Sequence, residues 1–78
     1  MPNWNDRWVI PHEGGWAVAK EDRERVSARF ATQGEAVTRG REIVRNAGGG
    51  ELIVLAENGQ IRQKDTVGAG HDDPHSPG

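Results

Sequence analysis

The chain contains no cysteine among its 78 residues, no tyrosine and a single phenylalanine. Without cysteine, neither a disulfide framework nor a thiolate zinc site can form. No apolar run approaches the roughly 18 residues that a membrane span needs, and the N-terminus lacks the basic and then apolar order of a signal peptide. We therefore expect a cytoplasmic protein that does not enter a membrane.

The charge balance does not favour a strongly basic protein. The formal net charge is −2, whereas nucleic-acid-binding domains usually carry a basic excess. Three aspartates fall in residues 65–78, so residues 1–64 hold ten basic and nine acidic side chains, a net charge of +1. Any basic surface must therefore come from the sorting of charges onto one face.

The first thirty residues predict three strands, at 7–11, 16–20 and 25–30, because each segment is rich in β-branched, aromatic or alternating side chains. Residues 12–15 form the first turn, where Gly14 and Gly15 can adopt positive φ. Pro11 ends the first strand or places it at a sheet edge. This part of the chain predicts a three-stranded meander.

A helix is expected over residues 32–47. Thr32 and Glu35 have the spacing of a capping box, apolar residues then recur at helical spacing, and the glycines at 48–50 stop the helix. Two more strands follow at 52–55 and 61–64, joined by Asn58-Gly59, which predicts a type I′ hairpin turn.

These elements predict an α+β fold: a single sheet in the order β-β-β-α-β-β, with one helix packed on one face. The composition of residues 68–78, rich in glycine, proline, aspartate and histidine, predicts a disordered acidic tail. We therefore divide the chain into a single domain at 1–67 and a tail at 68–78.

Four separated segments resemble a known family of small bacterial and phage proteins, catalogued as domain of unknown function 2188. The family has no established activity, so the resemblance supplies no functional residues. Gly34, where a helix-forming residue is expected, and Val67, where an aromatic residue is expected, depart from the family pattern. The segments are 9–18 (VIPHEGGWAV), 30–36 (FATQGEA), 49–54 (GGELIV) and 58–66 (NGQIRQKDT).

Two clusters contain side chains that could carry chemistry. His71, Asp72, Asp73 and His75 could bind a divalent transition metal, but a tail flanked by glycine and proline does not hold ligands in place. His12 and Glu13 could act as an acid–base pair, but they lie in a turn with no nucleophile nearby in sequence. We expect no enzyme activity, no catalytic residues, no metal and no cofactor.

Strand alternation divides the side chains of the sheet into two sets. The set expected to face the helix is Trp8, Ile10, Trp16, Val18, Val26, Ala28, Phe30, Leu52, Val54 and Ile61. The set expected on the opposite face is Arg7, Val9, Ala17, Ala19, Arg25, Ser27, Arg29, Ile53, Leu55, Arg62 and Lys64.

The opposite face suggests binding, although an ordinary solvated sheet face would also alternate in this way. Ile53 and Leu55, with Val9, would form an exposed apolar patch, which favours a protein partner or a homodimer. The alternative is a nucleic-acid-binding face, which can be built on a sheet backed by a helix. Its basic residues would be Arg7, Arg25, Arg29, Arg62 and Lys64. No small-molecule substrate is evident.

Overall fold

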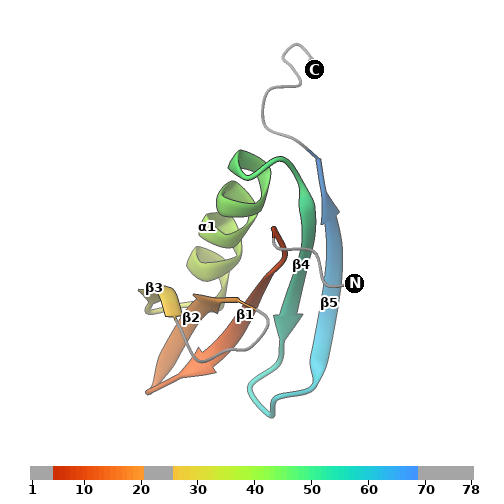
Figure 1. Cartoon of the computed structure of the whole chain (residues 1–78). Coiled ribbons are helices and arrows are strands. Elements are labelled where there is room, and N and C mark those ends of the chain that lie inside the picture. The colour runs from red at the N-terminus through yellow and green to blue at the C-terminus, as the bar shows by residue number, and fades with distance from the viewer. Residues whose placement is uncertain (1–4, 21–25, 69–78) are drawn as a thin grey trace.

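The computed structural model describes residues 5–20 and 26–68, and it confirms the predicted α+β fold and element order. The helix α1 lies against one side of the sheet, and β3 and β5 form the two edges (Figure 1). Arg25 and residues 69–78 lie outside the described residues. The elements are β1 (Arg7–His12), β2 (Gly15–Ala19), β3 (Val26–Phe30), α1 (Gln33–Asn46), β4 (Gly50–Leu55) and β5 (Ile61–Val67).

The sheet has the strand order β3-β2-β1-β4-β5, so β2, β1 and β4 are its inner strands, and the β1–β4 pair joins its two halves. β1 and β4 pair in parallel, whereas the other neighbouring strands are antiparallel. Two side chains just before β1 fix this junction: the Asp6 carboxylate accepts from Glu51 N at 2.7 Å, and Asn5 Nδ2 donates to Gly49 O at 3.0 Å.

The helix begins and ends as the sequence predicts. The Thr32 hydroxyl accepts a hydrogen bond from Glu35 N at 3.2 Å, which satisfies one of the free amides of the first turn. At the other end, Gly48 and Gly49 adopt φ of 110° and 96°, and Gly49 N donates to Val44 O. Glycine reaches this left-handed region without a steric penalty from Cβ, so the chain turns directly into β4.

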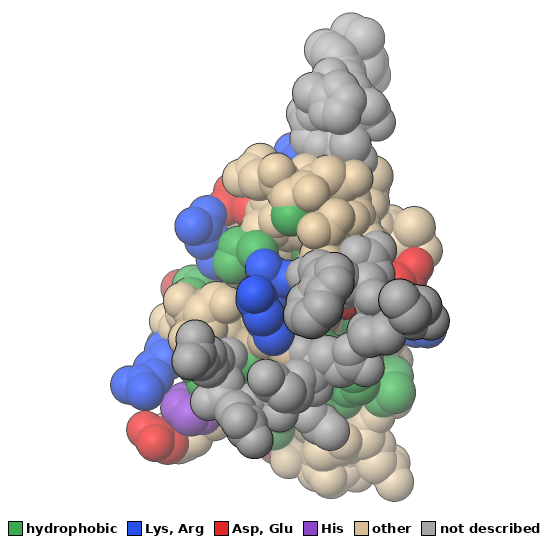
Figure 2. Space-filling view, viewed as in Figure 1, with side chains coloured by type: hydrophobic (Ala, Val, Ile, Leu, Met, Phe, Trp, Pro, Cys, Tyr) green, Lys and Arg blue, Asp and Glu red, His purple; other side chains and the backbone are tan. Residues whose placement is uncertain are grey.

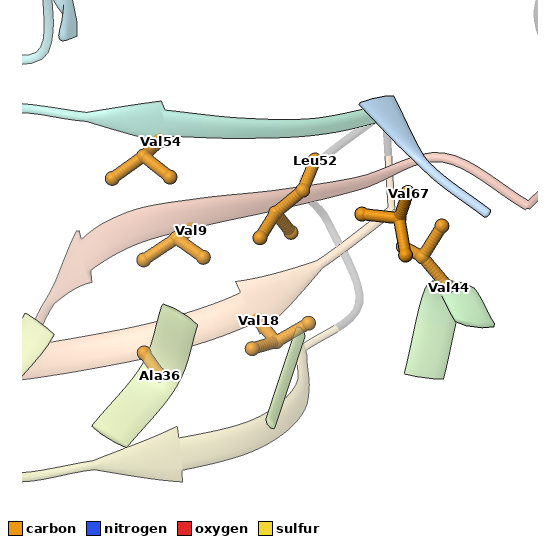
Figure 3. Close-up of a cluster of buried hydrophobic side chains, with 7 residues drawn as sticks. All are labelled: Val9, Val18, Ala36, Val44, Leu52, Val54 and Val67. Atoms are coloured by element: carbon orange, nitrogen blue, oxygen red, sulfur yellow. The ribbon is translucent and has the colours of Figure 1, made fainter. Parts of the chain in front are cut away.

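The main core fills the space between α1 and the sheet. Figure 3 shows its buried side chains, which come from α1 and from four strands. The helix approaches closely at Gly40, where an added Cβ would lie 2.8 Å from Leu52 Cδ1. Trp16 and Phe30 pack partly buried against the cluster, as expected. The buried members are Val9, Val18, Ala36, Val44, Leu52, Val54 and Val67.

The two hairpin turns differ from the predicted ones. The β1–β2 turn has positive φ at Glu13 and Gly14, 49° and 82°, as a type I′ turn requires. In the β4–β5 loop only Gly59 has positive φ, and Gly59 N donates to Ala56 O while Ala56 N donates to Gln60 O. This is the pattern of a longer loop built on a type I turn, so the hairpin prediction is confirmed and its turn type is wrong.

Several side chains lie on the other face from the one predicted. Val9 belongs to the core under α1, whereas Trp8 and Ile10 belong to a cluster on the opposite face. The error in β1 arises because an inner strand buried on both faces is apolar at every position, so alternation does not identify its faces.

In β3 and β5 the error comes from register shifts. Ser27 and Arg62 are the extra residues where the pairing changes register. Each such bulge reverses the alternation of the strand, so the residue just before it lies on the other face from the one that strict alternation predicts. Val26 and Ile61 therefore lie opposite α1, contrary to the prediction.

Substitution of the two helix glycines by alanine should have opposite effects on stability. At Gly34 an added Cβ meets nothing within 4 Å, so Gly34→Ala should raise the free energy of unfolding by roughly 0.5–1 kcal/mol. At Gly40 the close contact with fully buried Leu52 should make Gly40→Ala destabilising, by about 1–3 kcal/mol. Urea denaturation of both variants tests this, and equal gains in stability would contradict the packing at Gly40.

Candidate protein interface

The side of the sheet opposite α1, here called the outer face, carries a second apolar cluster. Its side chains lie in two rows that cross the strands. Register pairs connect Val26, Ala19, Trp8, Ile53 and Lys64 in the first row. The second row contains Arg29, Ala17 and Ile10, and then Leu55 and Ile61. No described helix or strand packs over this face, because α1 contacts the sheet from the other side.

The centre of the outer face is closed to solvent within a single chain. Ile53 is 6% exposed, Leu55 is 3% exposed, and Ala17 and Ala19 are fully buried. Exposure rises toward the β5 edge, where Ile61 is 61% exposed beside its register partner Leu55. Trp8 and Val26 of this cluster are partly buried, and Ile61 at the β5 end is the large hydrophobic side chain that is strongly exposed among the described residues.

The three residues proposed from the sequence for a protein interface have different positions. Ile53 and Leu55 lie on the predicted face but are buried there, while Val9 lies under α1 with no exposed surface. Sequence reasoning missed Ile61 as a surface residue because it assigned this side chain to the core. The signal that could have revealed it is the long β4–β5 loop, since a bulge beside such a loop reverses the alternation.

The five basic residues proposed for nucleic acid do not come together among the described residues. Arg29 and Lys64 share the outer face but lie on opposite edge strands, next to Ala17 and Ile53 respectively. The register of Arg7 with Leu52 places it on the α1 side, and its Nη1 donates to Asp6 O. Arg25 is outside the described residues.

Arg62, the fifth of these residues, is also on the α1 side, where it donates to the Gln33 side chain. Figure 2 shows one face of the molecule, on which basic side chains are separated by acidic and uncharged ones. A continuous basic surface of the predicted kind is therefore not formed by the described residues.

On its α1 side, β5 is connected to the helix by hydrogen bonds between polar side chains. Arg41 Nη2 donates to Asp65 Oδ2 at 3.0 Å, and Gln63 Nε2 donates to the same oxygen at 2.6 Å. Gln33 Nε2 donates to Leu55 O at 3.0 Å and so ties the first turn of α1 to the end of β4. Because Arg41 and Asp65 are partly exposed, their ion pair contributes little to stability, but these contacts orient β5 and therefore Ile61.

The second candidate site, at His12 and Glu13, has an open geometry. His12 Nε2 lies 3.8 Å from Glu13 Oε2, and the Glu13 side chain is 74% exposed at the tip of the turn. A shallow depression beside it is lined by Pro11, Trp16 and Glu57 together with the turn, and none of these supplies a hydroxyl or thiol nucleophile.

Neither a metal site nor a membrane span is found within residues 5–20 and 26–68. No group of three or more potential metal ligands occurs there, and the histidines at 71 and 75 lie outside these ranges. The described helix, α1, has 14 residues and is too short and too polar to cross a membrane.

Comparison of the sequence with known proteins identifies its family. Residues 7–67, which run from the start of β1 to the end of β5, match a family described as an uncharacterized protein conserved in bacteria, DUF2188. The chain belongs to this family. The resemblance noted from the sequence is thereby confirmed.

A relative in Bacillus subtilis, the uncharacterized protein YdaT, is 39% identical over 61 residues. The match covers 78% of this chain but 40% of YdaT, so the chain spans less than half the length of that relative. No solved structure matches the chain.

Lysine substitutions at Leu55 and Ile61, which are neighbours on the outer face, should distinguish a buried position from an exposed one. Leu55→Lys buries a charge at a position that is 3% exposed and should lower the free energy of unfolding by about 3 kcal/mol or more. Ile61→Lys adds the same charge at a position that is 61% exposed and should change stability by only about 0.5 kcal/mol. Thermal unfolding followed by circular dichroism measures both, and similar losses would contradict the burial described here.

Proposed function

We propose that the protein is a small non-enzymatic binding module that docks another protein at the β5 end of the outer face. A second copy of the chain is the first partner to test. The observation that carries the proposal is the exposure of Ile61 at the end of an apolar row. An apolar surface that continues an existing cluster is favoured as a contact site over a single isolated hydrophobic residue.

Ile61 fits this role because its surroundings are rigid and apolar. Leu55 lies directly across from it and is nearly fully buried. A partner would therefore contact a surface that is already ordered and would lose little entropy on binding. The α1 side of β5 is engaged by Arg41 and Gln33 through their contacts with Asp65 and Arg62. Those contacts leave the outer side of β5 as the accessible side of this strand.

The described residues support binding over catalysis and over recognition of nucleic acid. The His12–Glu13 pair has no nucleophile beside it, and acid–base catalysis requires a reacting group within hydrogen-bond reach. Recognition of phosphates needs several basic side chains acting together, whereas Arg29 and Lys64 stand on opposite edges of the sheet. The apolar surface at the β5 end of the outer face therefore suits a protein partner best.

Self-association should depend on Ile61. Sedimentation equilibrium of the wild-type chain should show a concentration-dependent dimer, and Ile61→Lys should shift it to monomer because a lysine would have to be desolvated in the contact. Asn46→Lys is the matched control, since it adds the same charge at the exposed C-terminal end of α1, where a cation is favourable.

If the wild-type chain stays monomeric at every concentration, the second copy is rejected as partner. Capture of proteins from a bacterial lysate by wild type and by Ile61→Lys then tests a different partner. Equal capture by the two proteins would show that the β5 end of the outer face is not the interface.

A further inference from the structure

Each edge strand pairs with one neighbour among the described strands, but the two edges differ in how their side chains are engaged. On β5 the side chains of Arg62, Gln63 and Asp65 are engaged in hydrogen bonds. On β3, which pairs only with β2 among the described strands, no side chain makes a hydrogen bond or ion pair with a described residue. Because β3 pairs only with β2, its outer edge has no partner among the described strands, and its backbone N–H and C=O groups there could pair with another strand.

A groove runs beside this edge, between β3 and the first half of α1. Its volume is about 710 Å³, and Phe30 and Ala31 supply its apolar wall. The helix contributes Gly34, Glu35, Thr38, Arg39 and Glu42, and Arg29 of β3 also lines the groove. An extended peptide that added to β3 would direct every second side chain into this groove, because successive side chains of a strand point to opposite faces.

Gly34 gives an independent reason to assign a ligand to the groove. It lies in the first turn of α1, where glycine costs stability relative to alanine. Nothing in the chain demands it, since an added Cβ would meet no atom within 4 Å. Gly34 lines the groove, so its missing side chain leaves that part of the groove open. Compared with alanine, Gly34 lowers the stability of the unbound chain but leaves room for a group of the ligand.

The charges around β3 specify which peptide fits. Within the groove Arg39 Nη1 already pairs with Glu42 at 2.9 Å. Glu35 and Arg29 also line the groove and are opposite in sign, so the charges of its lining balance and its apolar wall suits an apolar side chain. Arg29 is exposed on the outer face, opposite Ala17, and has no ion-pair partner among the described residues. An added strand would place a residue directly beside it, where an opposite charge is stabilising.

We propose that β3 accepts an extended segment of another protein as an additional strand, and that this segment alternates apolar residues with acidic ones. The apolar side chains enter the groove over Phe30 and beside Gly34, and an acidic side chain pairs with Arg29. Main-chain hydrogen bonds to the free edge of β3 supply sequence-independent affinity, and the two side-chain positions supply selectivity. This surface is separate from the β5 end of the outer face.

Three capped synthetic peptides test the proposal by amide chemical-shift titration of the whole chain. The first alternates valine with glutamate, the second alternates valine with lysine, and the third is the first peptide with every backbone amide methylated. The glutamate peptide should bind most tightly, with shifts confined to β3 and the first half of α1. The methylated peptide should not bind, because it cannot complete the strand ladder.

Two variants, Arg29→Glu and Gly34→Ala, test the named residues, and Arg45→Glu is the control for the charge change. Arg29→Glu should weaken the glutamate peptide roughly tenfold and reverse the preference between the two charged peptides. Arg45→Glu makes the same charge change in the last turn of α1, outside the groove, and should leave the preference unchanged. Gly34→Ala should weaken the glutamate peptide roughly fivefold or more by filling the groove, although it stabilises the free chain.

The proposal is overturned by any of three results: no peptide shifts the β3 amides, the methylated peptide binds as well as its parent, or the charge preference survives Arg29→Glu. If Gly34→Ala is more stable than wild type but binds the glutamate peptide with the same affinity, the groove is not part of the binding site, and the proposal is overturned in that part.

Discussion

The parallel pairing of β1 with β4 is the contact on which the rest of the structure depends. It joins an N-terminal meander to a C-terminal hairpin, and α1 is the connection that makes a parallel arrangement reachable. Asp6 and Asn5 secure the junction by bonding the backbone at Glu51 and Gly49. Because both strands are internal, their side chains are buried on both faces, and each face of the sheet acquires an apolar cluster.

This arrangement explains how a short chain with 33% hydrophobic residues forms two clusters. The cluster under α1 closes because Gly40 allows the helix to approach Leu52. The outer cluster is closed in its centre by Ile10, Ile53 and Leu55, which are at most 9% exposed. The strongly exposed Ile61 and the groove beside Phe30 both lie at edge strands, so both proposed contacts involve an edge strand and use different chemistry there.

The sequence determined the elements and their order. The capping residue Thr32, the helical spacing of apolar residues and the glycines after Asn46 are local signals, and each acts within a few residues of the feature it sets. The placement of Ile53 and Leu55 opposite α1 was also predictable, because β4 keeps its alternation over their positions. The burial of these two side chains was not predictable, since it depends on what surrounds them.

Only the tertiary structure decided which way β1 faces and where the alternation breaks. Trp8, Val9 and Ile10 are all apolar, so their order fits either orientation until β4 and α1 take their places. The register shifts at Ser27 and Arg62 reverse the faces of Val26 and Ile61, because the side-chain period of a strand is two residues. The exposed end of the outer face follows from that second shift, which is set by pairing with β4 and by the loop at Gly59.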